Sequence, residues 1–202
     1  MPKKIINALE QLQSRGSFSA KTTTATDNLC VEVNPIGQLR FPLKPQVIKK
    51  LIQQARPAPF GWRDETRLDT EVRDVWKIPR SRVKIDKHRW NQTLAPVLDK
   101  LKGQLGLPPG SLLKAELHDL LIYAPGQFFL PHQDSEKRDG MVATMVVILH
   151  SLHSGGTLVI DHQGEKQRCQ SSRAAVDQLT FIAFYADCHH EVRPVKEGYR
   201  VR

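Results

Sequence analysis

The chain changes its hydrophobic pattern near Gly110. After that residue, apolar side chains come in short runs that are rich in β-formers and show no helical period. The runs cover residues 112–123, 141–149, 156–160, 178–185 and 190–195. Turn-forming residues separate them, at Ala124-Pro125-Gly126, Arg138-Asp139-Gly140, Ser154-Gly155-Gly156 and Lys196-Glu197-Gly198. Several short strands without intervening helices predict an antiparallel sandwich or jelly roll.

Two helices are predicted in the first 110 residues. Pro45 begins the first, whose apolar residues recur at helical spacing as Val47, Ile48, Leu51, Ile52 and Ala55. The second has Asp86 as its expected N-cap and an apolar face made of Trp90, Leu94, Val97, Leu98, Leu101 and Leu105. Pro96 interrupts this pattern, so the second helix either kinks there or begins near Leu94. The Gly- and Pro-rich residues 106–110 end it.

Short strands are expected beside these helices. Cys30–Val33 and Leu39–Phe41 lie on either side of a turn, and Val75–Ile78 and Val83–Ile85 follow. Residues 11–27 are rich in Ser, Thr, Lys and Ala without an apolar period, which is typical of a loosely attached segment. The predicted organisation is one domain, mainly β with flanking helices (α+β). It has a mobile segment at 1–27, a helix-containing region at 28–110 packed on the core, and the core at 111–202.

Composition and charge narrow the class of protein. At 202 residues, 40% hydrophobic and 25% charged, the chain is long enough for one good core, and no apolar run could span a bilayer. Three scattered cysteines form no metal or disulfide pattern, and no signal-peptide pattern follows the N-terminus, so we expect a cytoplasmic protein. The net charge of +9 is concentrated in residues 1–111, where 20 Lys and Arg stand against 10 Asp and Glu. The densest basic region, Arg73 to Arg89, could contact nucleic acid, but the few interleaved aromatics favour a solvated surface.

Candidate chemistry lies in two short motifs. His132 and Asp134 are two residues apart, so both leave the same face of a strand. His189 and His190 follow downstream, and strand alternation lets only one of them enter the same site. Two imidazoles and one carboxylate are the ligands of the facial triad that binds non-haem Fe(II) and leaves other positions open. Arg200, ten residues past His190, has a planar guanidinium suited to a carboxylate.

These motifs belong to a wider pattern between Lys114 and Arg200. Its landmarks are Tyr123, Gly126-Gln127-Phe128-Phe129, His132-x-Asp134, Gly155-Gly156-Thr157-Leu158, the run 181–187, and His190-Glu191-Val192-x-Pro194-Val195-x-x-Gly198-x-Arg200. In order and spacing this pattern resembles the prolyl-4-hydroxylase-like branch of the Fe(II)- and 2-oxoglutarate-dependent dioxygenases. A lone His-x-Asp would be far less specific.

The resemblance implies a double-stranded β-helix, a jelly-roll variant, with the N-terminal helices packed on its outside. It places iron on His132, Asp134 and His190, and the far carboxylate of 2-oxoglutarate on Arg200 with the hydroxyl of Tyr123. Because Arg202 lies on the same strand face, the choice of Arg200 depends on family spacing alone. The chain ends two residues after Arg200, where a strand of this fold would be expected to continue.

The resemblance also implies the reaction and the cofactors. The expected cofactors are Fe(II), 2-oxoglutarate and O2. Ascorbate could serve as an accessory reductant. The expected reaction hydroxylates a C–H bond of a protein or peptide side chain, such as proline, and releases succinate and CO2. A small molecule or a nucleic acid base is the alternative substrate, and a non-catalytic jelly-roll binding module is the alternative class. The sequence leaves the oligomeric state open.

Overall fold

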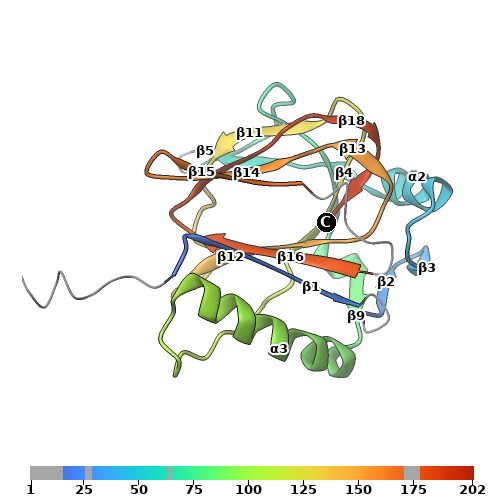
Figure 1. Cartoon of the computed structure of the whole chain (residues 1–202). Coiled ribbons are helices and arrows are strands. Elements are labelled where there is room, and N and C mark those ends of the chain that lie inside the picture. The colour runs from blue at the N-terminus through green and yellow to red at the C-terminus, as the bar shows by residue number, and fades with distance from the viewer. Residues whose placement is uncertain (1–15, 26–28, 63–64, 171–177) are drawn as a thin grey trace, which may run out of the picture.

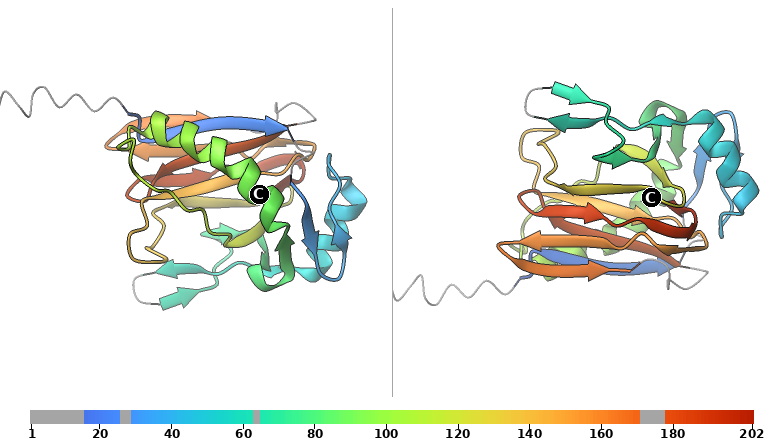
Figure 2. Two further views of the ribbon diagram at one scale, coloured as in Figure 1. Left: turned by 90° about the horizontal axis from the view of Figure 1, so that it is seen from below. Right: turned by 90° about the horizontal axis from the view of Figure 1, so that it is seen from above.

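Two antiparallel sheets face each other across the centre of the molecule (Figure 1). The computed structural model describes residues 16–25, 29–62, 65–170 and 178–202. Sheet I has the order β15-β14-β17-β11-β7 and consists of Glu165–Cys169, Leu158–His162, His189–Val192, Phe128–His132 and Arg73–Asp74. Sheet II has the order β1-β16-β12 and consists of Ser19–Ala25, Gln178–Tyr185 and Ala143–Ile148. Figure 2 shows the same pair of sheets from above and below.

Smaller sheets close the ends of this pair. One has the order β19-β10-β8-β4 and consists of Arg200–Val201, Asp119–Tyr123, Trp76–Pro79 and Arg56–Pro57. The others are β13-β18 (His153–Gly155, Val195–Gly198), β3-β2-β9 (Gly37–Gln38, Val31–Val33, Val83–Ile85) and β5-β6 (Phe60–Trp62, Glu65–Arg67). A short 3-10 helix, η2, covers Arg80–Arg82. Among the described residues strands predominate and there are two α-helices, so the mainly β prediction is confirmed.

Both predicted helices are present. The first, α2 (Pro45–Gln54), begins at the predicted proline. The second, α3 (Lys87–Leu105), is capped by Asp86, whose carboxylate accepts a hydrogen bond of 2.9 Å from the backbone N–H of Arg89. It continues through Pro96, which rules out the alternative start near Leu94, and ends at Gly106 with φ of 72°. α3 lies across the outer face of sheet II (Figure 1).

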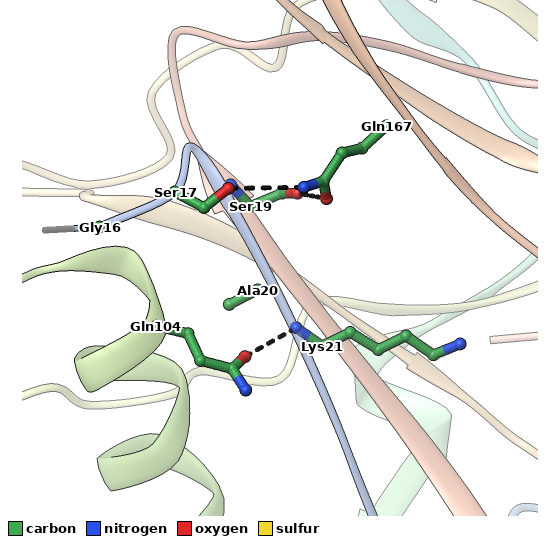
Figure 3. A pocket seen from close by; sticks show the side chains of 7 residues that line it. All are labelled: Gly16, Ser17, Ser19, Ala20, Lys21, Gln104 and Gln167. Atoms are coloured by element: carbon green, nitrogen blue, oxygen red, sulfur yellow. Dashed lines mark hydrogen bonds between the residues drawn. The ribbon is translucent and has the colours of Figure 1, made fainter.

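The segment expected to be loosely attached is instead partly built into sheet II. Ser19–Ala25 forms β1 and pairs along its whole length with β16. Figure 3 shows two further attachments: the side chain of Gln104 accepts from the backbone N–H of Lys21 at 2.9 Å, and the hydroxyl of Ser19 contacts Gln167. Backbone pairing with a buried strand does not need an apolar sequence, so the composition was a poor guide there. Residues 1–15 and 26–27 of the predicted segment lie outside the described residues.

Other element boundaries differ from the expected ones. Residues 112–118 precede β10 and are not a strand. Their side chains alternate between exposed and half-buried as in a strand, but they pair with no other strand among the described residues. Residues 196–198, expected as a turn, belong to β18, which pairs with β13. The strands β15 and β6 were not predicted, since their sequences are largely polar. The strand β5, Phe60-Gly61-Trp62, was not predicted either, because three residues are too few to show an alternating pattern.

Strand alternation divides the buried apolar residues into two cores. The outer core lies between sheet II, α3 and the N-terminal strands, and includes Leu101, Ile122 and Phe181. The inner core lies between sheets I and II, and includes Phe129 and Phe184. Because side chains alternate, single strands such as β10 and β16 contribute to both cores. No helix among the described residues is long and apolar enough to cross a membrane.

Candidate metal centre

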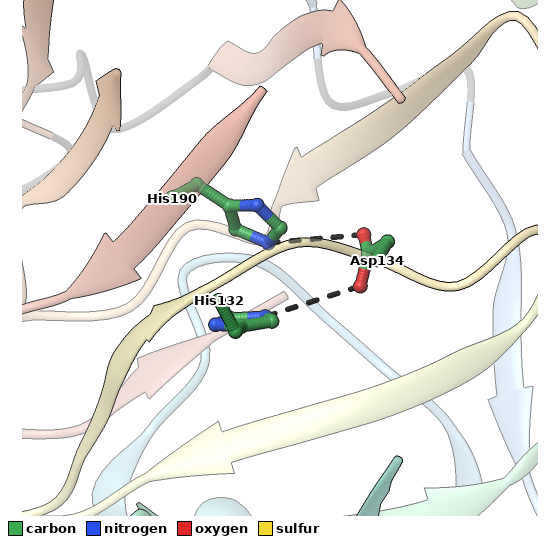
Figure 4. A group of neighbouring side chains, drawn as sticks. All are labelled: His132, Asp134 and His190. Carbon is green, nitrogen blue, oxygen red and sulfur yellow. Dashed lines mark ion pairs between the residues drawn. The ribbon is translucent and has the colours of Figure 1, made fainter. Parts of the chain in front are cut away.

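Three polar side chains meet at one edge of the inner core (Figure 4). β11 and β17 are antiparallel neighbours in sheet I, and their register sets His132 opposite His190. Asp134 follows the end of β11. Its carboxylate oxygens lie 3.9 Å from Nε2 of His132 and 3.7 Å from Nε2 of His190. The ligand atoms all lie within 4.8 Å of one another, so a single ion could be shared by all three.

Burial sets the protonation states of this cluster. It lowers the pKa of His132 to about 3, with His190 adding to the shift, and lowers the pKa of His190 to about 4. Burial alone would raise the pKa of Asp134, but His190, a hydrogen bond from Thr144 and His132 together bring it below its ordinary value. At neutral pH the cluster therefore consists of two neutral imidazoles and one carboxylate. This donor set, in these protonation states, fits a divalent iron ion.

Neighbouring groups orient two of the three side chains. Nδ1 of His132 donates to the carbonyl of Leu130 at 2.8 Å, which leaves Nε2 free to face Asp134. The ring of Phe129 stacks on the imidazole of His132 with centroids 3.4 Å apart. The hydroxyl of Thr144, from β12 in sheet II, donates to Oδ2 of Asp134 at 2.7 Å. Sequence reasoning missed Thr144, because no local motif connects it with Asp134.

The remaining histidines are separate from this cluster. His189 is exposed and His190 buried, so the two adjacent residues lie on opposite faces of β17 as alternation predicts. His150 is also buried, but among the described residues only His132, Asp134 and His190 form a candidate metal group. The open hollow in Figure 3 is lined mainly by Ser, Gln and Ala side chains and offers no comparable donor set.

The expected co-substrate residues lie together on the inner side of the β10–β19 pair. Arg200 and Tyr123 are register partners, and both are fully buried. The guanidinium carbon of Arg200 lies 5.5 Å from the centroid of the Tyr123 ring. Burial and the neighbouring Arg202 lower the pKa of Arg200 to about 9, which leaves it cationic at neutral pH. A buried cation beside a phenol is a chemically suitable place for a carboxylate.

Two further arginines reach the interior, and sequence reasoning assigned neither of them to the site. Nη2 of Arg202 donates to the hydroxyl of Tyr123 at 3.2 Å. Arg73 on β7 holds its guanidinium carbon 4.5 Å from the ring centroid of Phe129 and donates to the carbonyl of Pro59 at 2.6 Å. The expectation that the basic region from Arg73 onward is a solvated surface is therefore wrong for Arg73. Its register partner on β11 is Phe129, so it faces the same side of sheet I.

Comparison with known proteins gives one family match. Residues 118–202 match the sequence model of the 2OG-Fe(II) oxygenase superfamily. This segment contains the three residues of the metal cluster as well as Tyr123 and Arg200. No curated protein sequence matches the chain.

Solved structures that the chain matches include three prolyl hydroxylases. One is a prolyl hydroxylase of Trichoplax adhaerens in complex with a peptide fragment of hypoxia inducible factor, with 17% identity and a TM-score of 0.49 over 87% of this chain and 82% of that one. A prolyl-4-hydroxylase of Pseudomonas putida has 19% identity and a TM-score of 0.47 over 98% and 95%. The viral collagen prolyl hydroxylase of Paramecium Bursaria Chlorella virus-1 has 15% identity and a TM-score of 0.43 over 94% of each chain.

Proposed function

We propose, from the match of residues 118–202 to the model of the 2OG-Fe(II) oxygenase superfamily, that this protein hydroxylates a C–H bond of a protein or peptide side chain, such as proline. The match confirms the predicted oxygenase and its cofactors Fe(II), 2-oxoglutarate and O2. We further propose that sheets I and II are the two halves of a double-stranded β-helix. The observation that carries the proposal is the meeting of His132, Asp134 and His190 at the inner core that also encloses Tyr123 and Arg200.

The three side chains of the cluster hold the metal in this proposal. The hydrogen bond from His132 Nδ1 to Leu130 leaves Nε2 as the coordinating atom. Thr144 fixes the orientation of Asp134 across the gap between the two sheets. When bound, Fe(II) and 2-oxoglutarate supply O2 activation, in which one oxygen atom enters the substrate C–H bond and the other enters succinate as CO2 is lost. The protein's own contribution is to keep the imidazoles neutral, orient the carboxylate and leave the other positions on the metal open.

Arg200 and Tyr123 hold the far carboxylate of 2-oxoglutarate in this proposal. A guanidinium offers two parallel N–H donors to a carboxylate, and the buried position makes that interaction strong. Gly156 makes room for Arg200, because a Cβ at that position would lie 2.8 Å from Cδ of Arg200. Gly156 also has φ of 62°, a conformation that favours glycine.

The surroundings of the metal cluster support an apolar substrate side chain. The side chains of His132 and Asp134 are 18% and 26% exposed, so the cluster is open to solvent on one side. Leu130 and Val142 lie two residues before His132 and Thr144, and both are unusually exposed for large hydrophobic residues, at 44% and 41%. In this proposal Leu130 and Val142 line the approach to the metal, where they would suit a neutral side chain presented on a peptide better than a charged one.

Nothing in the site favours a nucleic acid base as the substrate. The exposed basic side chains Arg80, Arg82, Lys84, Lys87 and Arg89 lie on η2, β9 and the start of α3, outside sheet I. Arg82 and Arg89 make local contacts, to the carbonyl of Gln54 and to Sγ of Cys30. These exposed basic residues therefore belong to a surface other than the one at the metal cluster.

The test is turnover in the presence of Fe(II), 2-oxoglutarate and O2. We expect succinate and CO2 in equal amounts, and we expect a library of proline-containing peptides to stimulate this turnover more than nucleosides or small metabolites. Each active peptide should gain the mass of one oxygen atom. Stimulation by nucleosides alone would overturn the protein-substrate proposal, and absence of succinate with every candidate would overturn the activity itself.

A further inference from the structure

The last residues of the chain bring two arginines, not one, to the same phenol. β19 pairs with β10 so that Arg200 lies opposite Tyr123 and Val201 opposite Ile122. Beyond β19, Arg202 exchanges both backbone hydrogen bonds with Leu121, at 2.8 and 3.0 Å. Strand alternation then places Leu121, Tyr123, Arg200 and Arg202 on the inner side of the pair. The core assignments agree, since Leu121 and Tyr123 belong to the inner core and Ile122 and Val201 to the outer core.

The two guanidinium groups lie at similar distances from the Tyr123 ring. Their Cζ atoms are 5.5 Å (Arg200) and 5.7 Å (Arg202) from the ring centroid. Arg202 also donates to the Tyr123 hydroxyl at 3.2 Å. Its positive charge contributes to lowering the pKa of both His132 and His190, so it acts electrostatically on the metal cluster.

Arg202 lacks a counter-ion within the protein. Among the described residues no carboxylate forms an ion pair with it, and its buried Nε has no hydrogen-bond partner. Two cations in a partly dry interior repel each other, and an unused buried N–H is costly. A bound carboxylate would offset both costs, because its two oxygens can accept several hydrogen bonds at once.

We infer that Arg202 is a second binding residue for the far carboxylate of 2-oxoglutarate, sharing it with Arg200 and the hydroxyl of Tyr123. This inference rests on the proposed function, since it assigns a further residue to the same co-substrate. The spacing of the family motif assigned this carboxylate to Arg200 alone, and the inference adds Arg202. Arg202 is thus a selectivity residue for a dicarboxylic 2-oxo acid over a monocarboxylic one.

The experiment measures 2-oxo acid binding to the anaerobic Fe(II) protein, by its charge-transfer absorption and by calorimetry. We expect Arg202→Ala to weaken 2-oxoglutarate binding about 10- to 100-fold, the range of one charge-assisted hydrogen bond, with Fe(II) affinity unchanged. 2-Oxopentanoate, which has no far carboxylate, should bind equally to the wild type and the variant. Arg202→Lys, which keeps the charge, should weaken 2-oxoglutarate binding less than Arg202→Ala does.

The matched control is Arg193→Ala, because Arg193 is exposed, pairs with Glu191 at 3.2 Å and follows β17 rather than belonging to the β10–β19 pair. It should leave binding of both acids unchanged. Unchanged 2-oxoglutarate binding in Arg202→Ala, or an equal loss for both acids, would overturn the assignment while the proposed function stands. A wild-type protein that binds Fe(II) but no 2-oxoglutarate would overturn the proposed function together with this assignment.

Discussion

The outer and inner cores are built from the same strands but contain different chemistry. The outer core is a cluster of buried hydrophobic residues to which α2 and α3 both contribute side chains. The inner core is also largely apolar, yet it borders His190 and encloses Arg200, two of the few buried ionisable groups. On β10, Ile122 points to one core and Tyr123 to the other. The period of two along a strand thus separates residues that stabilise the fold from the residues proposed to bind metal and co-substrate, and substitutions on the two faces should have different effects.

The largest effect is expected at the metal cluster. His190→Ala removes one of three ligands, so we expect loss of bound Fe(II) and of all measurable turnover, with the circular dichroism spectrum unchanged. His189→Ala is the matched control, since His189 is the neighbour of His190 on β17 but is exposed to solvent. Metal analysis of both purified proteins checks the prediction. Full iron occupancy in His190→Ala would remove that residue from the ligand set.

The next effect concerns Arg200, which is fully buried in the inner core. Removing one partner of a buried ion pair costs on the order of 3–5 kcal/mol, so Arg200→Ala should raise the KM for 2-oxoglutarate by about two to four decades. Arg200→Lys should recover only part of this loss, because lysine keeps the charge but not the paired donors. Fe(II) should still bind, since Arg200 is not a ligand. A KM that rises in Arg202→Ala but not in Arg200→Ala would show that family spacing selected the wrong arginine.

A substitution in the outer core should lower the stability of the fold and leave the binding of metal and co-substrate unchanged. Leu101 on α3 is 1% exposed, and Leu101→Ala should lower the free energy of unfolding by about 2–5 kcal/mol. The remaining folded protein should bind Fe(II) and 2-oxoglutarate with wild-type affinity. Urea unfolding combined with metal titration at low temperature measures both quantities. A large loss of affinity in this variant would mean that the two cores are not independent.

The three residues of the candidate metal cluster were predictable because they belong to two short motifs, on a strand or just after one. Alternation alone selected His132 with Asp134 and allowed only one of His189 and His190, and the apolar runs identified β12 and β16. Contacts that depend on the pairing of segments far apart in the sequence could not be predicted. β1 has one Lys and four polar residues among its seven, yet it joins sheet II. Arg73 was predicted to be a surface charge, because the pairing of β7 with β11 cannot be inferred from the sequence. Thr144 and Arg202 gain their roles only through the packing of sheet II and of the β10–β19 pair.

Gly156 gives a test of the room that Arg200 needs. A Cβ at this position would lie 2.8 Å from Cδ of Arg200, so Gly156→Ala should displace the guanidinium and weaken 2-oxoglutarate binding at least about tenfold. Gly164→Ala is the matched control, because Gly164 also has positive φ but has no atom within 4 Å of its added Cβ. Both variants carry the same kind of backbone strain, and only the first affects Arg200. Equal binding by the two variants would show that Arg200 tolerates the shift.

The smallest effect is expected at Thr144, where sheet II reaches across to the metal cluster. Its hydroxyl donates to Oδ2 of Asp134 at 2.7 Å, and loss of such a supporting hydrogen bond typically costs 10- to 100-fold in metal affinity. Because Asp134 is partly exposed, water can replace the donor. We therefore expect Thr144→Val to lower the Fe(II) affinity by about tenfold, the lower end of this range. Thr144→Ser keeps the hydroxyl and should restore the affinity, which a role in packing alone would not predict. Titration with Fe(II) under anaerobic conditions measures this directly. Equal affinities in the Val and Ser variants would mean that Asp134 is oriented by the two histidines and the metal rather than from the opposite sheet.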